Sequence, residues 1–255
     1  MNRWVYTQQC LEHLQRTVPS DVRIIVINNG SQDETSEKLR EYPWVDTISN
    51  GTNLGCARAW NQGIDSSPLA SWRIFLNNDV LLPANWLNGL MDAAESLALD
   101  IVSPAMREGI INYSFEERAS FVTTRMRDLA RLGFPHGVCF AVRRTVFEKI
   151  GRFDEAFKFG QFEDTDFFRR ASAAGFTSAT VGTSFIHHFS SVTQNALRKE
   201  YVSSYEAENR AYFRRKWNLH WLKRKFEKFS AARRLRSFVS AERAVSGSML
   251  IDRSL

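Results

Sequence analysis

Three groups of polar residues stand where a small ligand could bind, directly after apolar segments that predict β-strands. In a parallel α/β sheet, ligands bind beyond the carboxyl ends of the strands, because the side chains that follow each strand meet at one edge. Any single group could be only a turn, since Asn, Gly and Asp are common turn formers. Three in succession favour a shared binding site. The groups are Asn28-Asn29-Gly30-Ser31-Gln32-Asp33 after residues 22–27, Asn53-Leu54-Gly55 after residues 45–48, and Asn77-Asn78-Asp79 after residues 72–76.

A second cluster contains three carboxylates within four positions, Glu163, Asp164 and Asp166. They fall at the predicted start of a helix, where the positive end of the helix dipole stabilises ionised carboxylates. A carboxylate held in this way can act as a general base that takes a proton from a hydroxyl group. The alternative is an ordinary acidic first turn, because acids are enriched at helix starts.

The segments around these residues alternate between strand and helix patterns. Short apolar runs that predict strands occupy residues 22–27, 45–48, 72–76, 101–103, 137–143 and 177–181. Helix patterns occupy residues 4–14, 56–64, 83–97, 145–150 and 163–175. Between residues 106 and 135 the sequence is mixed and polar, without a clear pattern. The alternation predicts an open α/β sheet with helices on both faces.

The composition is that of an ordinary folded protein and excludes several classes. The 255 residues are 44% hydrophobic and 24% charged, a balance that excludes disordered and collagen-like chains. Three widely spaced cysteines without a CxxC pair encode neither a disulfide framework nor a cysteine-ligated zinc site, which fits a reducing compartment. The sequence has no run of about 18 apolar residues, and its start lacks the apolar core of a signal peptide. We therefore expect a protein that neither spans a membrane nor is exported.

The net charge of +6 is concentrated near the carboxyl end. Residues 196–255 hold 15 Lys and Arg against 6 Asp and Glu, so the rest of the chain is slightly acidic. Nucleic acid is therefore not an expected partner, because the main body lacks a basic surface. In the tail, Trp217, Trp221, Leu222 and Phe226 form an apolar stripe at helical spacing. The stripe could lie on an anionic membrane surface, or it could pack on the rest of the protein.

Six motifs occur in an order that resembles a known enzyme family. They are VINNGSQDET, NLGCARAWNQGI, FLNNDV, IGRFDEAF, GQFEDTDFFRR and IHHFSSVT, and they lie within residues 2–195. The chain resembles the family 2 glycosyltransferases of the GT-A fold, in particular the bacterial rhamnosyltransferase-like members. The resemblance implies an open mixed α/β sheet and an inverting transfer of a sugar from a UDP- or dTDP-sugar to a hydroxyl group. The acceptor would be a cell-surface glycan or a lipid-linked glycan, and rhamnose is one candidate sugar.

By this resemblance, Asn77-Asn78-Asp79 stands in the place of a DxD motif whose last Asp holds a divalent cation. The first Asp of the motif is Asn here. A hard cation such as Mg²⁺ or Mn²⁺ needs only one or two protein ligands when the substrate diphosphate supplies the others. In the family, a histidine after the last core strand often completes the site. His187 and His188 both fit, and we expect His187 to be the ligand; an exposed polar turn is the alternative for such a pair.

The resemblance also assigns the base and the donor site. Asp164 corresponds to the general base of the family's ED motif, and Glu163 would help to orient the acceptor. Asn28 stands where many relatives have an Asp that touches the nucleotide base, and an amide can still hydrogen-bond a uracil or thymine edge. Arg58 and Asn61 could reach the diphosphate or ribose, although a helix-surface Arg is often solvated. The expected donor-binding residues are Asn28, Asn29, Ser31, Asp33, Asn53, Gly55, Arg58, Asn61, Asn77 and Asn78.

We expect three parts along the chain. Residues 1–105 would bind the nucleotide sugar, residues 106–195 would bind the acceptor and carry the base, and residues 196–255 would form a basic helical tail. The expected location is the cytoplasm. The tail would place the enzyme on the inner face of the cell membrane, close to a lipid-linked acceptor.

The start of the chain predicts an unusual sheet. Family members open with an apolar strand that ends in a turn, and residues 1–4 resemble the end of that turn. We therefore expect the first, central strand to be missing, which would leave unpaired backbone groups and an apolar slot. Either the native reading frame starts upstream, or another segment fills the slot.

Two other functions compete with this prediction. A sugar-phosphate nucleotidyltransferase would share the α/β sheet and the cation, but it should carry a glycine-rich, basic phosphate loop near its start, and the sequence has none. A non-catalytic glycan-binding or scaffolding protein with a truncated GT-A domain is the main alternative. The missing strand favours that alternative, whereas the retained Asp79, Asp164 and His187 favour an enzyme.

Overall fold

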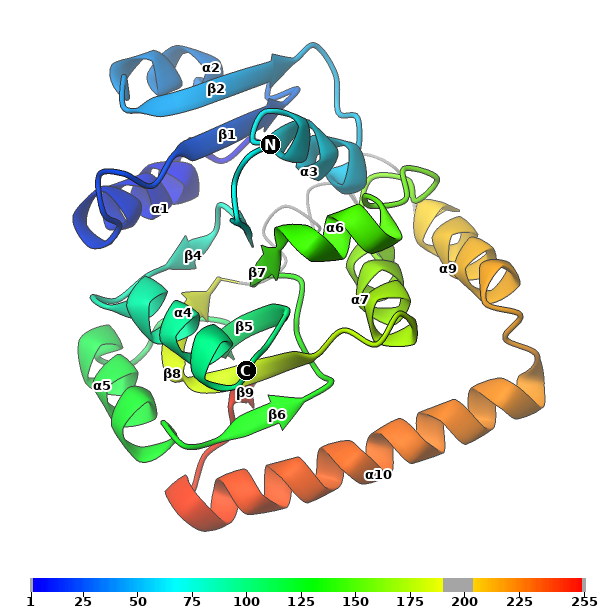
Figure 1. Cartoon of the computed structure of the whole chain (residues 1–255). Coiled ribbons are helices and arrows are strands. Elements are labelled where there is room, and N and C mark those ends of the chain that lie inside the picture. The colour runs from blue at the N-terminus through cyan, green and yellow to red at the C-terminus, as the bar shows by residue number, and fades with distance from the viewer. Residues whose placement is uncertain (1, 190–203, 254–255) are drawn as a thin grey trace.

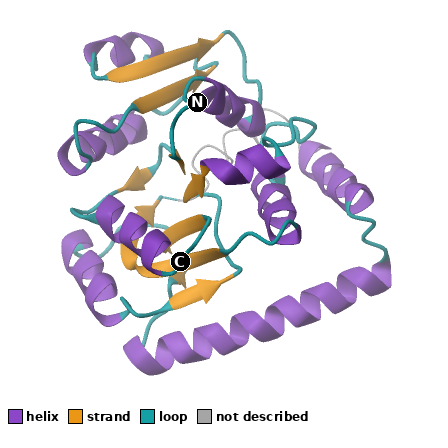
Figure 2. Ribbon diagram, in the orientation of Figure 1, coloured by secondary structure: helices purple, strands orange, loops and turns teal. Residues whose placement is uncertain are grey.

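The computed structural model describes residues 2–189 and 204–253, and most of its strands form one mixed sheet (Figures 1 and 2). These strands are β3 (Trp72–Leu76), β4 (Val80–Leu81), β5 (Ile101–Glu108), β6 (Ala130–Leu132), β7 (Cys139–Arg143), β8 (Ser178–His188) and β9 (Ile251–Asp252). Their order is β3-β7-β5-β8-β4, while β6 pairs with β8 and β9 pairs with β5. Strands β5 and β8 run parallel, whereas β7 is antiparallel to both of its neighbours. The predicted α/β sheet of mixed type is confirmed.

The first two strands form a separate parallel pair, β1 (Ile24–Asn29) and β2 (Val45–Asn50). Figure 1 shows this pair apart from the larger sheet. In the part of the chain that the structure describes, β1 pairs only with β2, and β3 pairs only with β7. A cavity of about 1540 Å³ is lined by Ile25 and Ile27 of β1 and by Ile74 and Leu76 of β3. Among the described residues, no strand lies between β1 and β3, and an apolar slot separates them.

Helices cover the sheet through three hydrophobic clusters, two of them large. The helices before the tail are α1 (Trp4–Thr17), α2 (Thr35–Lys38) with a 3₁₀ turn at Leu39–Glu41, α3 (Cys56–Asp65), α4 (Trp86–Ser96), α5 (Phe115–Arg125), α6 (Arg144–Ile150) and α7 (Glu163–Ala173). One large cluster joins α1 and α4 to the sheet, with Leu11, Leu90 and Ile186 buried in it. The other large cluster joins α3, α6 and α7 to the sheet around the buried rings of Phe140 and Phe167. Because long-range apolar contacts fix both faces, the loops at the sheet edge sit on a rigid support.

Four strands run further than the sequence pattern predicts: β1 and β2 by two residues each, and β5 and β8 by more. Strand β5 continues past residue 103 to Glu108, and β8 continues past Gly182 to His188. A register shift at Pro104/Ala105 lets the two strands stay paired beyond Gly182, up to Glu108 opposite His188. The two histidines are therefore strand residues and not an exposed turn. Residues 105 and 106, where two parts were expected to meet, both lie inside β5.

The tail forms two helices, α9 (Ser204–Lys216) and α10 (Trp221–Ser246), and then returns to the sheet as β9. Figure 1 shows α10 running along the side of the molecule that carries β6. A buried ion pair fixes it there, with 2.6 Å between Arg131 Nη2 and Glu242 Oε2. The backbone N–H of Leu250 also donates to Glu242 Oε2, at 2.9 Å. Within the described ranges, none of the helices combines the length and the apolar character that a membrane crossing needs.

Candidate functional site

The cavity between β1 and β3 continues to the carboxyl ends of these strands, where most of the predicted site residues meet. Its wall carries polar side chains from the loops after β1, β2 and β3, from the start of α7 and from the end of β8. The predicted residues on this wall are Asn28, Asn29, Ser31, Asn53, Asn77, Asn78, Asp79, Glu163, Asp164 and His188. Five predicted residues are not on it, namely Asp33, Gly55, Arg58, Asn61 and His187.

The two amides that end β1 hold the neighbouring loops in place. Asn28 is buried, and its Nδ2 donates to Ser36 Oγ at 2.7 Å while its Oδ1 accepts from the N–H of Ser31 at 3.2 Å. Asn29 Nδ2 donates to Asn53 Oδ1 at 2.9 Å. The backbone N–H of Leu54 donates to Asn29 Oδ1 at 3.1 Å. Each amide thus has protein partners on both of its polar atoms, so the loops that would face a nucleotide are tied to one another.

Asp33 caps a turn. Its carboxylate accepts from the backbone N–H groups of Trp4 and Thr35, both at 3.2 Å, and from the Thr35 hydroxyl. Partial burial acts to raise the pKa of Asp33, but these hydrogen bonds outweigh it and hold the pKa below its usual value. The structure therefore gives Asp33 the task of joining the start of α1 to the loop after β1.

Arg58 and Asn61 lie on α3 away from the cavity. Asn61 is buried, and its side chain donates to the carbonyl of Phe153 at 3.0 Å and accepts from the N–H of Phe153 at 3.1 Å. Arg58 is exposed, and its Nε lies 3.9 Å from Glu155 Oε2. Asn61 thus pins the segment before α7 onto α3, and neither side chain is brought to the other predicted donor residues.

Asp79 and His188 face each other at the bottom of the cavity. The distance between Asp79 Oδ1 and His188 Nε2 is 3.3 Å, and both side chains are buried. Strand β4 pairs antiparallel with β8, with Val80 opposite His188, so Asp79 comes next to that histidine. Burial acts to lower the pKa of His188, but contacts with Asp79 and Glu108 outweigh it and raise the pKa to about 9.

His187 points elsewhere, because successive residues of a strand face opposite sides of the sheet. Its Nδ1 lies 2.7 Å from the hydroxyl of Tyr113. Burial first, and then the charges of His188 and Arg107, lower the pKa of His187 to about 4. The sequence favoured His187 as the cation ligand, whereas the geometry favours His188. Alternation along β8 decides between two neighbours that sequence spacing could not separate.

The pair of Asp79 and His188 fits a divalent cation that shares its ligands with a substrate. A carboxylate and an imidazole are two suitable ligands, and diphosphate oxygens can complete the shell of a hard cation. No group of three or more His, Cys, Asp and Glu side chains with metal-site geometry occurs in the described ranges. The protein residues are therefore too few for a closed structural metal site and suit an open one.

The carboxylate pair Glu163 and Asp164 opens α7 and also lines the cavity. Burial first, and then the charge of Asp164, raise the pKa of Glu163, and burial also raises the pKa of Asp164. A Cβ atom at Gly137 would lie 2.2 Å from Asp164 Oδ2, so only glycine fits beside this carboxylate. Carboxylates with raised pKa values on a cavity wall are typical of general bases.

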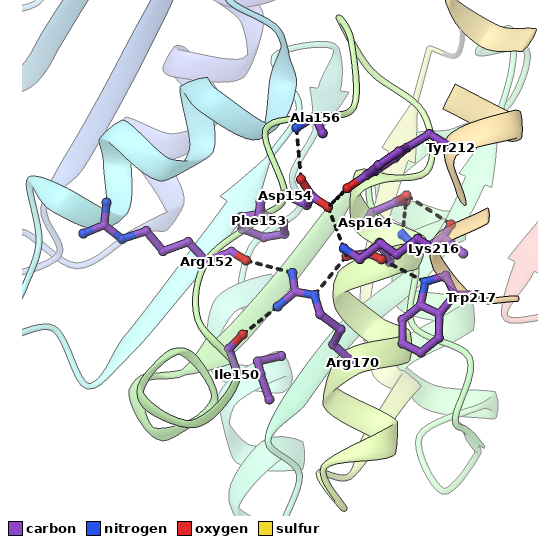
Figure 3. Close-up of polar contacts among 12 residues, drawn as sticks. Ile150, Arg152, Phe153, Asp154, Ala156, Asp164, Arg170, Tyr212, Lys216 and Trp217 are labelled. Carbon is purple, nitrogen blue, oxygen red and sulfur yellow. Dashed lines mark hydrogen bonds and ion pairs between the residues drawn. The ribbon is translucent and has the colours of Figure 1, made fainter. Parts of the chain in front are cut away.

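Asp166 is buried and serves a different purpose. Figure 3 shows its neighbours Arg170, Lys216 and Trp217. Its carboxylate accepts from Arg170 on α7, from Lys216 at the end of α9 and from Trp217 Nε1, each at 2.9 Å. Lys216 also donates to Asp154, at 2.6 Å. Asp166 thus joins the carboxylate-bearing helix to the tail.

Two charged residues of this site were missed by the sequence analysis. Glu108 lies on the cavity wall with its Oε1 3.5 Å from His188 Nδ1. Arg253, which follows β9, also lies on the wall, 2.9 Å from Glu108 Oε2. Nothing in the local sequence distinguishes Arg253 from the other basic residues of the tail. Its position depends on β9 pairing with β5, about 145 residues away in the chain.

Sequence comparisons place this arrangement in a known family. Residues 1–151 match Glycosyl transferase family 2, and residues 111–208 match Glycosyltransferase like family 2. N-acetylglucosaminyl-diphospho-decaprenol L-rhamnosyltransferase of Mycobacterium tuberculosis is 27% identical over 221 residues, which cover 72% of this chain and 71% of that protein. The uncharacterized glycosyltransferase EpsJ of Bacillus subtilis is 26% identical, over 64% of this chain and 51% of its own length.

Solved structures support the fold. GalNAc-T7 with UDP, GalNAc and Mn²⁺ superposes with a TM-score of 0.59 at 16% identity, over 73% of this chain and 41% of that one. The mannosyltransferase PcManGT of Pyrobaculum calidifontis, in complex with GDP-Man and Mn²⁺, gives a TM-score of 0.54 at 16% identity, over 73% of this chain and 54% of that one. These similarities establish the GT-A fold.

Proposed function

Because this chain belongs to glycosyl transferase family 2, we propose that it is an inverting, cation-dependent glycosyltransferase. It moves a sugar from a UDP- or dTDP-sugar to a hydroxyl group of a glycan or lipid-linked acceptor. One observation carries the proposal. The Asp79–His188 pair and the Glu163–Asp164 pair line the same cavity, so groups suited to hold a diphosphate and to deprotonate an acceptor share one site.

In the proposed reaction, Asp164 is the general base. An inverting transfer needs a carboxylate that takes the proton of the acceptor hydroxyl while its oxygen attacks C1 from the face opposite the leaving group. Asp164 lies on the cavity wall with room beside it only because residue 137 is glycine. Glu163, which is more deeply buried next to it, helps to orient the acceptor and raises the basicity of the pair.

Asp79 and His188 would hold Mg²⁺ or Mn²⁺. The bound cation supplies charge stabilisation for the departing nucleoside diphosphate. Arg253 adds a fixed positive charge on the same wall, where Glu108 now pairs with it. The loops after β1 and β2 would face the nucleotide and the diphosphate, with Asn28, Asn29, Ser31 and Asn53 on their surface.

A rhamnosyl donor and a lipid-linked acceptor are the substrates that we propose first. The name of the Mycobacterium tuberculosis relative specifies a rhamnosyl group and a diphospho-decaprenol acceptor. The test is a thermal-shift panel of UDP- and dTDP-sugars with Mn²⁺ or with chelator, because a ligand that binds only the folded state raises the melting temperature. A donor that stabilises the protein only with cation, followed by turnover with a lipid-linked acceptor, supports the enzyme. Glycan binding without turnover of any donor would favour the scaffolding alternative.

We further propose that α10 rests on the inner face of the cell membrane. Its apolar side chains Trp221, Leu222, Phe226 and Phe229 are each more than 60% exposed, so they do not pack on the catalytic part of the protein. Trp217, the first residue of the predicted stripe, packs instead against the Asp166 carboxylate. Exposed aromatic side chains flanked by lysines and arginines are typical of helices that lie on anionic lipid.

Vesicle co-sedimentation tests this contact. Binding to vesicles with anionic lipid should fall as salt rises, because the attraction is electrostatic, and neutral vesicles should bind weakly. A variant with Trp221, Phe226 and Phe229 all changed to Ser should stay in the supernatant. The matched control changes Leu69 and Ile110, two exposed apolar residues outside α10, to Ser. Equal pelleting of the α10 variant and the wild type would refute the proposal.

A further inference from the structure

The loop that leads into the carboxylate pair has an unusual backbone. Phe159, Gln161 and Phe162 have φ angles of 55°, 76° and 75°. Residues other than glycine rarely adopt this left-handed backbone conformation, which persists only where the surrounding structure holds it in place. Phe162 directly precedes Glu163, the first residue of α7. The position of the carboxylate pair therefore depends on whatever holds this loop.

The side chain of Asn209 on α9 holds it. Asn209 is buried, with 1% of its surface exposed. Its Oδ1 accepts from the backbone N–H of Lys158 at 2.9 Å. Its Nδ2 lies within donor distance of three loop carbonyls, those of Lys158 and Gly160 at 2.9 Å and that of Gln161 at 3.3 Å. One side chain thus pairs with backbone groups of Lys158, Gly160 and Gln161, about 50 residues away in the sequence.

Neighbouring contacts from α9 reinforce this hold. Gln161 donates to Glu206 at 2.9 Å, and the ring of Phe162 packs against Phe213 with 5.3 Å between centroids. The end of α9 is fixed to α7 itself, because Lys216 Nζ donates to Asp166 at 2.9 Å. Helix α9 therefore contacts both the loop and the helix that follows it.

The same loop reaches the donor side of the cavity. The carbonyl of Phe159 accepts from the backbone N–H of Cys56, the first residue of α3, at 2.8 Å. A Cβ atom at Gly55 would lie 3.1 Å from the N atom of Phe159, so the two backbones are in close contact. Because this loop contacts α3 at one end and leads into α7 at the other, it fixes the distance between the donor side of the cavity and Asp164, the proposed base.

We propose that Asn209 is a positioning residue for sugar transfer, which holds the strained loop 158–162 so that Asp164 faces the acceptor. This inference rests on the proposed function of Asp164 as the base. It gives α9, which is part of the tail, a role in positioning the base, in addition to the role proposed for α10 at a membrane. Asn209 itself touches neither the cavity nor the reacting groups, so its effect passes through the loop.

Kinetics of Asn209→Ala give the first test. We expect kcat to fall at least about tenfold, because a small displacement of a catalytic group is costly, while the KM for the donor stays within about twofold. The matched control is Arg210→Ala, which alters the next residue of the same helix, an exposed one. Asn209→Asp keeps the side-chain volume and the acceptor for Lys158 but places a carboxylate against three carbonyls. Asn209→Asp should also lose activity, and it provides a second test if Asn209→Ala does not fold.

A second readout does not depend on glycosyl transfer. Cys56 starts α3 beneath the loop, and burial, followed by the charges of Glu163 and Asp164, raises the pKa of its thiol. Loosening the loop should expose this thiol, so alkylation of Cys56, followed by mass spectrometry, should be at least about tenfold faster in Asn209→Ala. Cys139 in the centre of the sheet is fully buried and serves as the internal control, because it reacts only on global unfolding.

The outcomes separate the two proposals. Faster Cys56 labelling without any transfer activity in the wild type would keep Asn209 as the holder of the loop and would refute the proposed reaction. If both Asn209 variants fold, label Cys56 at the wild-type rate and keep kcat within about twofold, the positioning role is wrong.

Discussion

The two walls of the cavity are stabilised in different ways. The donor wall rests on β1 and β2, a pair of strands whose inner edge has no partner among the described residues. The acceptor wall rests on α7, which is held by the buried Asp166 carboxylate, by Arg170 and by the end of α9. Both walls carry polar residues of one site, but the donor wall has a strand edge that lacks a partner among the described residues, whereas the acceptor wall is a helix held by side-chain contacts.

The difference shows that all the side chains of a site can be present even though the strands and helices that carry them are not equally stabilised. Backbone groups that face an apolar slot lack the ladder hydrogen bonds that stabilise a central strand. Side-chain networks cannot replace them, because they act at single points. We therefore expect the donor wall to be the less stable half, and the following variants test that expectation.

Supplying a strand to the slot should have the largest effect. Asn2 lies at the carboxyl end of β1, where its backbone N–H donates to Ser31 Oγ at 3.0 Å. A fusion that places about six Val and Ile residues and a short turn ahead of residue 1 can therefore reach the slot. Each unpaired buried backbone group costs about 1 to 3 kcal/mol, so the melting temperature should rise by at least about 5 °C.

A Gly/Ser extension of equal length is the control for the fused strand. Hydrogen exchange at β1 and β3 should slow only with the apolar extension, because the new ladder bonds protect those amides. Donor binding should strengthen in parallel. Equal melting temperatures for the two extensions would show that the two walls do not differ in the way proposed.

Removing the base tests the acceptor wall. Asp164→Asn should lower kcat by at least about 100-fold, the usual contribution of a positioned base, or about 2.7 kcal/mol in the activation free energy. Donor binding, measured by thermal shift with Mn²⁺, should be unchanged, because Asp164 is on the other wall. Gly137→Ala should cause a smaller loss, since the added methyl group displaces the same carboxylate. Wild-type turnover in Asp164→Asn would assign the base to another residue.

The two histidines test the assignment on the donor side. His188→Ala should weaken cation-dependent donor binding by at least about tenfold, because His188 faces Asp79. His187→Ala, which only loses its contact with Tyr113, should have a weaker effect. Isothermal titration of the donor with Mn²⁺ measures both variants. A larger loss in His187→Ala would restore the assignment that the sequence favoured.

The smallest expected effect concerns the pH dependence of stability. Burial and the charge of Asp164 raise the pKa of Glu163 to about 8 in the folded protein, from an ordinary value of 4.5. The folded state then binds this proton more tightly than the unfolded state does. The resulting stability is complete below about pH 4.5 and is lost as the pH rises through about 8.

Glu163→Gln should remove this dependence, so that its melting temperature falls less than that of the wild type between about pH 5 and pH 9. Glu117→Gln is the matched control, because Glu117 is an exposed acid in the first turn of α5. If the melting temperatures of Glu163→Gln and the wild type change in parallel with pH, burial does not raise the pKa of this carboxylate.

The sequence alone was sufficient for the features that depend on local pattern. The strand runs at residues 22–27 and 72–76, the polar residues after them, and the acids at the start of a helix all follow from neighbours a few positions apart. These features need only short-range spacing and the rule that ligands bind at the carboxyl edge of the sheet.

The tertiary structure decided the rest, because the partners lie far apart in the chain. Which histidine faces Asp79 depends on the pairing of β4 with β8, and the side chain alternates with each residue of that pairing. Asn209 and Arg253 look ordinary in the sequence, and they gain their places only when α9 meets the loop before α7 and β9 pairs with β5. No periodicity encodes a contact between residues 50 or 145 positions apart, so such residues become visible only when the chain is folded.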